Sequence, residues 1–161
     1  GPDGNAVANY RKLHLTKVEK RLYTAGSEVV VADTELGKLG LMICWDMAFP
    51  ELARMLTLRG ADLLLCPAAW DAPHADLYRC FARMRALENT VFMAVCNHAG
   101  SVDSIEYFGE SSVYGPNGDL LASAAEGKLE AVVKYAIASD LIPSMREGYY
   151  TMLEDRRSDL Y

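Results

Sequence analysis

Short apolar runs alternate with amphipathic segments through the first two thirds of the chain. Residues 29–34 form a β-branched run, and a Gly-Lys turn then leads into a second apolar run at 39–44. Both runs have the length of strands, and together they predict a hairpin whose second strand is buried. After this strand, Pro50 stands where the first turn of a helix accepts proline, and apolar residues at helical spacing predict a helix up to Gly60.

The alternation of strand and helix then repeats. Residues 61–67 and 91–96 form two further apolar runs of strand length, and the segment between them predicts a helix that ends near Asn89. The expected inner face of this helix carries the apolar residues Leu77, Cys80, Phe81, Met84 and Leu87. Strands that are apolar almost throughout and are joined by helices predict an α/β sheet that is buried on both faces.

Beyond Gly100 the pattern is that of antiparallel strands joined by tight turns. Short strands are predicted at 111–114, 120–122 and 129–135, with turns at 115–118 and 126–127. Residues 149–161 are charged and aromatic, and we expect them to form a tail that packs on another surface. Because no repeat or linker interrupts residues 1–161, they predict one domain or part of one.

The composition fits a globular domain with a substantial core: of 161 residues, 51% are hydrophobic and 24% are charged. The net charge of −6 argues against a nucleic-acid or anionic-membrane surface, because both need a clustered excess of Lys and Arg. No apolar stretch approaches the ~18 residues that span a bilayer, and the first residues lack the pattern of a signal peptide. We therefore expect a cytoplasmic protein with a small-molecule partner.

The cysteines and histidines favour neither disulfides nor a zinc site. The four cysteines include no Cys-x-x-Cys pair, and three of them end or lie inside apolar runs, where free thiols are common. His14, His74 and His98 show no ligand spacing with one another or with the cysteines.

Cys44 is the residue whose position suggests chemistry. It ends a predicted buried strand, and the helix that follows points its N-terminus toward the same region. The helix dipole and the free backbone N–H groups favour a thiolate there, and the thiolate is the nucleophilic form of cysteine. The alternative is a small apolar core residue, because free cysteines are among the most buried residues. Position alone leaves both interpretations open.

The residues around Cys44 resemble those of a known family. Residues 40–51, GLMICWDMAFPE, closely resemble the nucleophile signature of the nitrilase superfamily of carbon–nitrogen hydrolases, and residues 10–15, YRKLHL, resemble its lysine motif. The two motifs stand in the family's order, and Lys12 lies 32 residues before Cys44, a separation typical of the family. Further agreement lies at 60–62, 83, 85–89, 97–100, 108–112 and 116–118. The resemblance thus covers nearly the whole chain.

This resemblance implies an α-β-β-α four-layer sandwich, of which the chain would contribute the later strands and helices. It implies that Cys44 attacks the substrate to form a thioester and release an amine or ammonia. Lys12 would hold positive charge against the oxyanion, beside the backbone N–H of Trp45. No metal or organic cofactor is implied.

The family lends weaker support to three further site residues: Glu19, Trp45 and Trp70. Glu19 resembles the family's additional active-site glutamate, which positions the lysine or the substrate; the alternative is an exposed acid in a charged stretch. Trp45 and Trp70 are candidates for the substrate pocket, although aromatic residues near strand ends are often only packing. Asp46 and Glu51 are expected to cap or orient the helix after the nucleophile rather than to transfer protons.

The proton-transferring glutamate of the family's Glu-Lys-Cys apparatus is not found. In the family it lies well upstream of the lysine, and the residues before Lys12 contain no glutamate. We therefore expect the chain to lack the N-terminal part of its domain and to be inactive alone. The alternative is a non-catalytic remnant of the fold.

The residues after the nucleophile indicate a branch of the superfamily. True nitrilases tend to carry Cys-Trp-Glu followed by Asn, whereas Cys44, Trp45 and Asp46 followed by Phe-Pro-Glu resemble the amidase and carbamoyl-amidase branches. This predicts cleavage of a non-peptide C–N bond in a small amide or N-carbamoyl compound, with nitrile hydrolysis as the alternative. Since family members pair through helix faces and their C-terminal tails often cross to the partner, we also expect a homodimer or a higher homo-oligomer.

Overall fold

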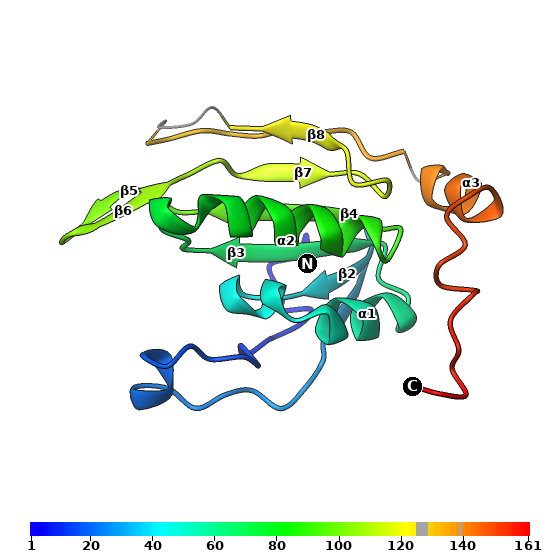
Figure 1. Cartoon of the computed structure of the whole chain (residues 1–161), viewed down its shortest axis with the longest axis horizontal. Coiled ribbons are helices and arrows are strands. Elements are labelled where there is room, and N and C mark those ends of the chain that lie inside the picture. Colours follow the sequence, from blue (N-terminus) through cyan, green and yellow to red (C-terminus); the bar gives the residue numbers. More distant parts are fainter. Residues whose placement is uncertain (125–128, 139) are drawn as a thin grey trace.

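The fold is built on a mixed six-stranded sheet. A computed structural model of the chain describes residues 1–124, 129–138 and 140–161. In it the strands follow the order β1-β2-β3-β4-β7-β8, with β2, β3 and β4 parallel and the others antiparallel to their neighbours (Figure 1). Their bounds are β1 Val31–Thr34, β2 Gly37–Leu41, β3 Leu63–Ala68, β4 Phe92–Asn97, β7 Ser112–Tyr114 and β8 Leu120–Ser123.

The predicted hairpin is confirmed, with its turn displaced. β1 and β2 pair antiparallel with Val31 opposite Gly40 and Thr34 opposite Gly37, so the turn is formed by residues 35–36 rather than by the Gly-Lys pair. Gly37 begins β2 with a φ of +106°, a backbone conformation that residues with a Cβ rarely adopt. The Gly-Lys pair therefore marked the end of the turn.

Two helices cover one face of this sheet. α1 (Pro50–Leu58) begins at the predicted proline, and α2 (Ala75–Leu87) lies beside it on the same face (Figure 1). At Gly40 an added Cβ would lie 2.7 Å from Leu64 Cδ2 and 3.1 Å from Leu56 Cβ. Only glycine therefore lets α1 and β3 pack this closely on β2.

The inner face of α2 differs from the predicted one. Leu77 and Met84 are 47% and 39% exposed, and Cys80 is exposed as well. The buried residues of the helix are Tyr78, Ala82, Arg85 and Ala86. The prediction followed the largest apolar residues, whereas the helix turns its alanines inward, and small side chains let its backbone approach the sheet.

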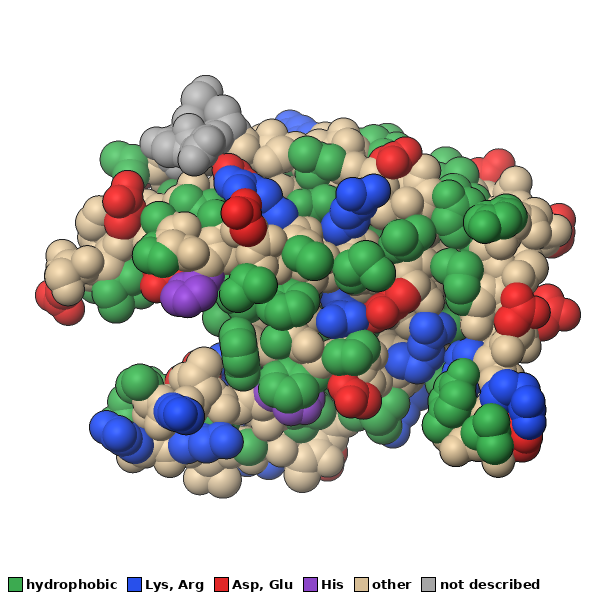
Figure 2. Space-filling view, viewed as in Figure 1, with side chains coloured by type: hydrophobic (Ala, Val, Ile, Leu, Met, Phe, Trp, Pro, Cys, Tyr) green, Lys and Arg blue, Asp and Glu red, His purple; other side chains and the backbone are tan. Residues whose placement is uncertain are grey.

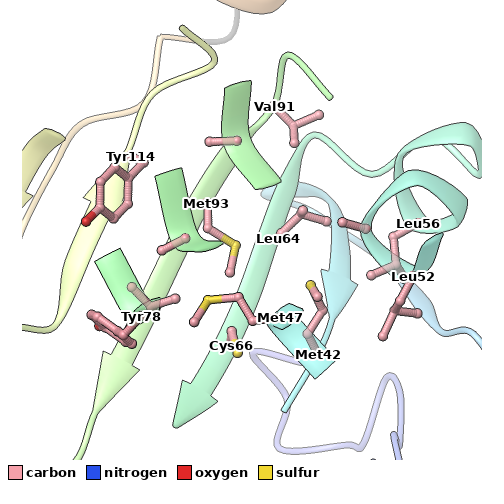
Figure 3. Packing of buried hydrophobic residues seen from close by; sticks show 14 of the residues in the cluster. Met42, Met47, Leu52, Leu56, Leu64, Cys66, Tyr78, Val91, Met93 and Tyr114 are labelled. Carbon is pink, nitrogen blue, oxygen red and sulfur yellow. The ribbon is translucent and has the colours of Figure 1, made fainter. Parts of the chain in front are cut away.

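The core lies between the sheet and these helices. Figure 3 shows Met42 and Leu64 from the sheet region packing toward Leu52 and Leu56 of α1. On the opposite face Leu63, Leu65 and other alternate residues are only half-buried, and residues 131–137 lie against that side. The sequence predicted a sheet buried on both faces. Among the described residues, only the face that α1 and α2 cover is fully buried.

Several elements depart from the sequence pattern. The ribbon of β5 (Ala99–Val102) and β6 (Ile105–Phe108) and the helix α3 (Leu141–Glu147) were not predicted. The strand predicted at 129–135 is wrong, because this segment has no ladder partner within the described residues, and the turn predicted at 126–127 lies outside them. Along the described part of the chain, none of the helices is long and apolar enough to cross a membrane.

Candidate active site

Cys44 lies at a sharp bend between β2 and α1. The strand ends at Leu41, three residues before the predicted end, and Cys44 is the first residue of a 3-10 helix, η2 (Cys44–Ala48). Its φ is +49°, a left-handed conformation that costs a residue with a Cβ about 1–3 kcal/mol and that clusters at functional sites. We call this bend the elbow. The first N–H groups of a helix have no acceptor within it, and at the elbow these are the backbone N–H groups of Cys44 and Trp45.

Cys66 forms part of the packing beneath the elbow. Its Sγ lies 4.0 Å from the carbonyl oxygen of Cys44, and Cys66 is 1% exposed. Figure 3 shows Met47 of η2 beside it. Burial, and then the neighbouring Cys44, raise the pKa of the Cys66 thiol far above its ordinary value. Cys66 therefore stays protonated at neutral pH and is the structural cysteine of the pair.

Arg85 anchors the same elbow to α2. Its Nε donates to the carbonyl oxygen of Met47 over 2.9 Å, and its guanidinium also pairs with Glu88. Arg85 is 5% exposed. A charged residue is tolerated in this buried position because its donors meet a carbonyl and a carboxylate.

Lys12 and Glu19 lie together, as the resemblance implied. Lys12 Nζ is 2.6 and 2.7 Å from the two carboxylate oxygens of Glu19, and the lysine side chain is only 9% exposed. Glu19 also accepts a hydrogen bond of 2.8 Å from the backbone N–H of Thr16. Burial raises the pKa of Glu19, but the hydrogen bonds from Lys12 and Thr16 outweigh it, so the pKa lies below its ordinary value. The carboxylate is therefore ionised at neutral pH and bound to the lysine.

A fully buried carboxylate joins the lysine segment to the elbow. Asp46, which is 0% exposed, accepts hydrogen bonds at Oδ1 from His14 N (2.8 Å) and His14 Nδ1 (2.9 Å). At Oδ2 it accepts from Tyr10 OH (2.7 Å) and Ile43 N (3.0 Å). The bond from Ile43 fits the expected role of Asp46 in orienting the turn. The contacts to Tyr10 and His14 were not foreseen, although both residues belong to the lysine motif.

Aromatic rings surround the elbow. The ring centroids of Trp45 and Trp70 are 5.5 Å apart, and His14 stacks on Phe49 at 3.8 Å. Trp45 is half-buried, whereas Trp70 is 5% exposed and is held through its backbone by Asn97. Trp45 is thus placed at the surface of the site, with Trp70 behind it.

One side of the molecule is hollowed. Figure 2 shows the molecule hollowed on the left, between the lower lobe that contains the 3-10 turn η1 (Glu19–Arg21) and the upper lobe that contains the β5–β6 ribbon. In Figure 1 the short coil of η2 lies toward the inner end of this hollow.

Comparison with known proteins assigns the family. The sequence profile described as carbon-nitrogen hydrolase matches residues 1–147. The chain belongs to the carbon-nitrogen hydrolase family. This confirms the resemblance seen in the nucleophile and lysine motifs.

The relatives of this chain agree with the assignment. It is 40% identical over 159 residues to a probable nitrilase of Schizosaccharomyces pombe, covering 99% of this chain and 58% of that protein. It is 35% identical over 167 residues to a 2-oxoglutaramate amidase of Paenarthrobacter nicotinovorans, covering 99% and 56%. The crystal structure of a carbon-nitrogen hydrolase from Helicobacter pylori matches with a TM-score of 0.90 at 32% identity, covering 99% of this chain and 61% of that one.

The chain spans somewhat more than half the length of these relatives. Its fold is of the predicted α-β-β-α type. The helices α1 and α2 and the six-stranded sheet make one helical layer and one sheet layer of that sandwich.

Proposed function

We propose that this chain carries the nucleophile and the cationic residue of an enzyme that cleaves the C–N bond of a small amide or N-carbamoyl compound. The observation that carries the proposal is the left-handed elbow at Cys44, at the N-terminus of η2. The alternative, that Cys44 is a core residue, is weakened because Cys66 already occupies the buried position beneath it.

In the first half of the reaction the Cys44 thiolate adds to the carbonyl carbon of the substrate. The negative charge that develops on the oxygen is met by the Lys12 ammonium and by the backbone N–H of Trp45. When the tetrahedral intermediate collapses, the C–N bond breaks, and the nitrogen takes up a proton and leaves as ammonia or an amine. A thioester on Cys44 remains.

In the second half, water adds to the thioester carbon and gives up a proton. The C–S bond then breaks, which releases a carboxylic acid, or a carbamic acid from an N-carbamoyl substrate, and regenerates the thiolate. None of these reaction steps uses a metal ion. Trp45 would line the substrate pocket, and Trp70 would support it from behind.

Glu19 positions the lysine in this proposal. With both oxygens on Lys12 Nζ, it holds the lysine side chain in place. It is thereby occupied, as is Asp46 with its four hydrogen bonds. The proton-transferring glutamate implied by the family is therefore neither of these two residues. An enzyme without that base should turn over about 10²–10⁴-fold more slowly than one that has it.

Nitrile hydrolysis is the second candidate, because the relative from Schizosaccharomyces pombe is named a probable nitrilase. A nitrile would give a thioimidate on Cys44 and consume two water molecules to yield an acid and ammonia. An amide and the nitrile of the same carbon skeleton, assayed side by side, separate the two activities. We expect faster ammonia release from the amide.

The nucleophile can be tested by the rate at which each cysteine is alkylated, without measuring turnover. Cys80 and Cys96 are exposed, whereas Cys44 is half-buried. Accessibility alone would make Cys80 and Cys96 react faster with iodoacetamide. The proposal predicts the reverse, with Cys44 labelled first at pH 7 and slowed by Lys12→Met. Peptide mass spectrometry identifies the labelled site, and Cys44→Ala and Cys80→Ala are the matched variants. Labelling of Cys44 no faster than that of Cys80 and Cys96 would contradict the proposal.

A further inference from the structure

We infer that Asp46 is a positioning residue that sets the placement of Lys12 relative to Cys44. This rests on the proposed function of those two residues. The two segments that carry them are far apart in sequence, and Asp46 contacts both. The inference adds to Cys44, Lys12 and Glu19 a further residue, one that acts through Lys12 without touching substrate.

The geometry gives Asp46 this role because its partners flank the reactive residues on both sides. Tyr10 and His14 stand two residues before and two residues after Lys12. Ile43 immediately precedes Cys44, and Asp46 itself follows it by two residues. Both residues assigned to chemistry are therefore bracketed by groups bound to a single carboxylate.

The chemistry of the position selects a carboxylate. Two donors converge on Oδ1, at 2.8 and 2.9 Å, and two on Oδ2, at 2.7 and 3.0 Å. An asparagine has one carbonyl oxygen and one NH2 group, so either orientation would turn donors against donors. Because the site is 0% exposed, water cannot make good the loss.

The Tyr10 hydroxyl stays a donor at neutral pH. Burial, and then the hydrogen bond and negative charge of Asp46, raise the pKa of the Tyr10 hydroxyl well above its ordinary value. Tyr10 therefore remains a protonated donor, and its oxygen also accepts a bond of 3.3 Å from the N–H of Leu13. The carboxylate thus holds the Tyr10 side chain before Lys12 and the backbone N–H of His14 after it.

The test is Asp46→Asn, assayed by the rate of iodoacetamide labelling of Cys44 between pH 6 and 10. If Asp46 acts through Lys12, labelling at pH 7 should fall on the order of 100-fold, because a displacement of about 1 Å at a reactive centre has that effect. At pH 10, where thiols ionise without help, the rates of variant and wild type should converge. Cys80 and Cys96 serve as internal standards, and circular dichroism checks the fold.

A double-mutant cycle separates positioning from simple stabilisation. Lys12→Met and Asp46→Asn should each slow Cys44, and the double variant should be no slower than Lys12→Met alone, because both remove the same interaction. Additive effects would mean that Asp46 acts independently of Lys12, which would overturn the inference. An unchanged Asp46→Asn rate would overturn it too, while leaving the proposed function intact.

A milder variant keeps the test valid if Asp46→Asn does not fold. Tyr10→Phe removes one donor from the carboxylate and should slow Cys44 several-fold at pH 7, again with convergence at pH 10. Tyr23→Phe is the matched control, because Tyr23 is 66% exposed. Equal rates in Tyr10→Phe and Tyr23→Phe would refute the inference. Slow labelling of Cys44 in the wild type would instead refute the proposed function.

Discussion

A single methyl group added at Gly26 should displace Lys12 relative to Cys44. Its backbone N–H donates to the carbonyl oxygen of Lys12 over 2.8 Å, so the chain segments around Gly26 and Lys12 lie in direct contact there. A Cβ at this position would lie 2.2 Å from the carbonyl oxygen of Arg11 and 2.9 Å from its carbonyl carbon. Both are backbone atoms, which cannot rotate away as a side chain would.

The magnitude follows from these distances. Ordinary contact needs about 3.5 Å, so Gly26→Ala must push the chain at Arg11 away by about 1 Å. Since Lys12 is the next residue, its ammonium should move with it. Overpacking of this kind costs about 1–3 kcal/mol of the free energy of unfolding. A displacement of about 1 Å at a reactive group lowers rates on the order of 100-fold.

Two measurements check this. The melting temperature of Gly26→Ala, followed by circular dichroism, should fall by about 2–4 °C for each kcal/mol lost. The labelling rate of Cys44 at pH 7 should fall by a larger factor than the rates of the exposed cysteines. Ser27→Ala is the control, because it changes the adjacent exposed residue of the same loop without adding an atom.

Two results would refute the reasoning. If Gly26→Ala melts and labels as the wild type does, the backbone contact at Arg11 is not needed for the loop. If it melts lower but Cys44 labels at the wild-type rate, the loop is held there for stability alone, and Lys12 does not depend on it.

Three further predictions follow. Glu19→Gln should lower the melting temperature at pH 7, and by less in acid. The fold lowers the pKa of Glu19 from 4.5, so the carboxylate stabilises the fold fully above about pH 4.5, and this stabilisation is lost as the pH falls through the lowered pKa. An equal fall in melting temperature at pH 3 and pH 7 would contradict this. Arg85→Met should lower the free energy of unfolding in urea by about 1–3 kcal/mol, because it leaves the Met47 carbonyl without its donor; no loss would mean that this bond is dispensable. Finally, the homodimer that the family resemblance predicts can be tested on the exposed side of α2. If that face makes the contact, Leu77→Glu combined with Met84→Glu should lower the mass measured by sedimentation, and an unchanged mass would exclude that face.

Much of this chain could be predicted from local pattern. Pro50 begins α1 as expected, because its restricted φ suits a first helical turn whatever lies around it. The β1–β2 hairpin and the parallel strands β3 and β4 also follow from short apolar runs bounded by turns. The motifs around Lys12 and Cys44 named the family before any coordinates, because they consist of consecutive residues.

Tertiary structure decided what no local pattern encodes. The buried face of α2 runs through Ala82, Ala86 and Arg85, because close approach to the sheet and a carbonyl partner at Met47 outweigh side-chain size. Residues 129–135 have strand composition but lack a ladder partner within the described residues, and a strand needs a neighbour. The four bonds to Asp46 join residues 3 to 36 positions away in sequence, so this contact between the lysine segment and the elbow exists only once the chain has folded.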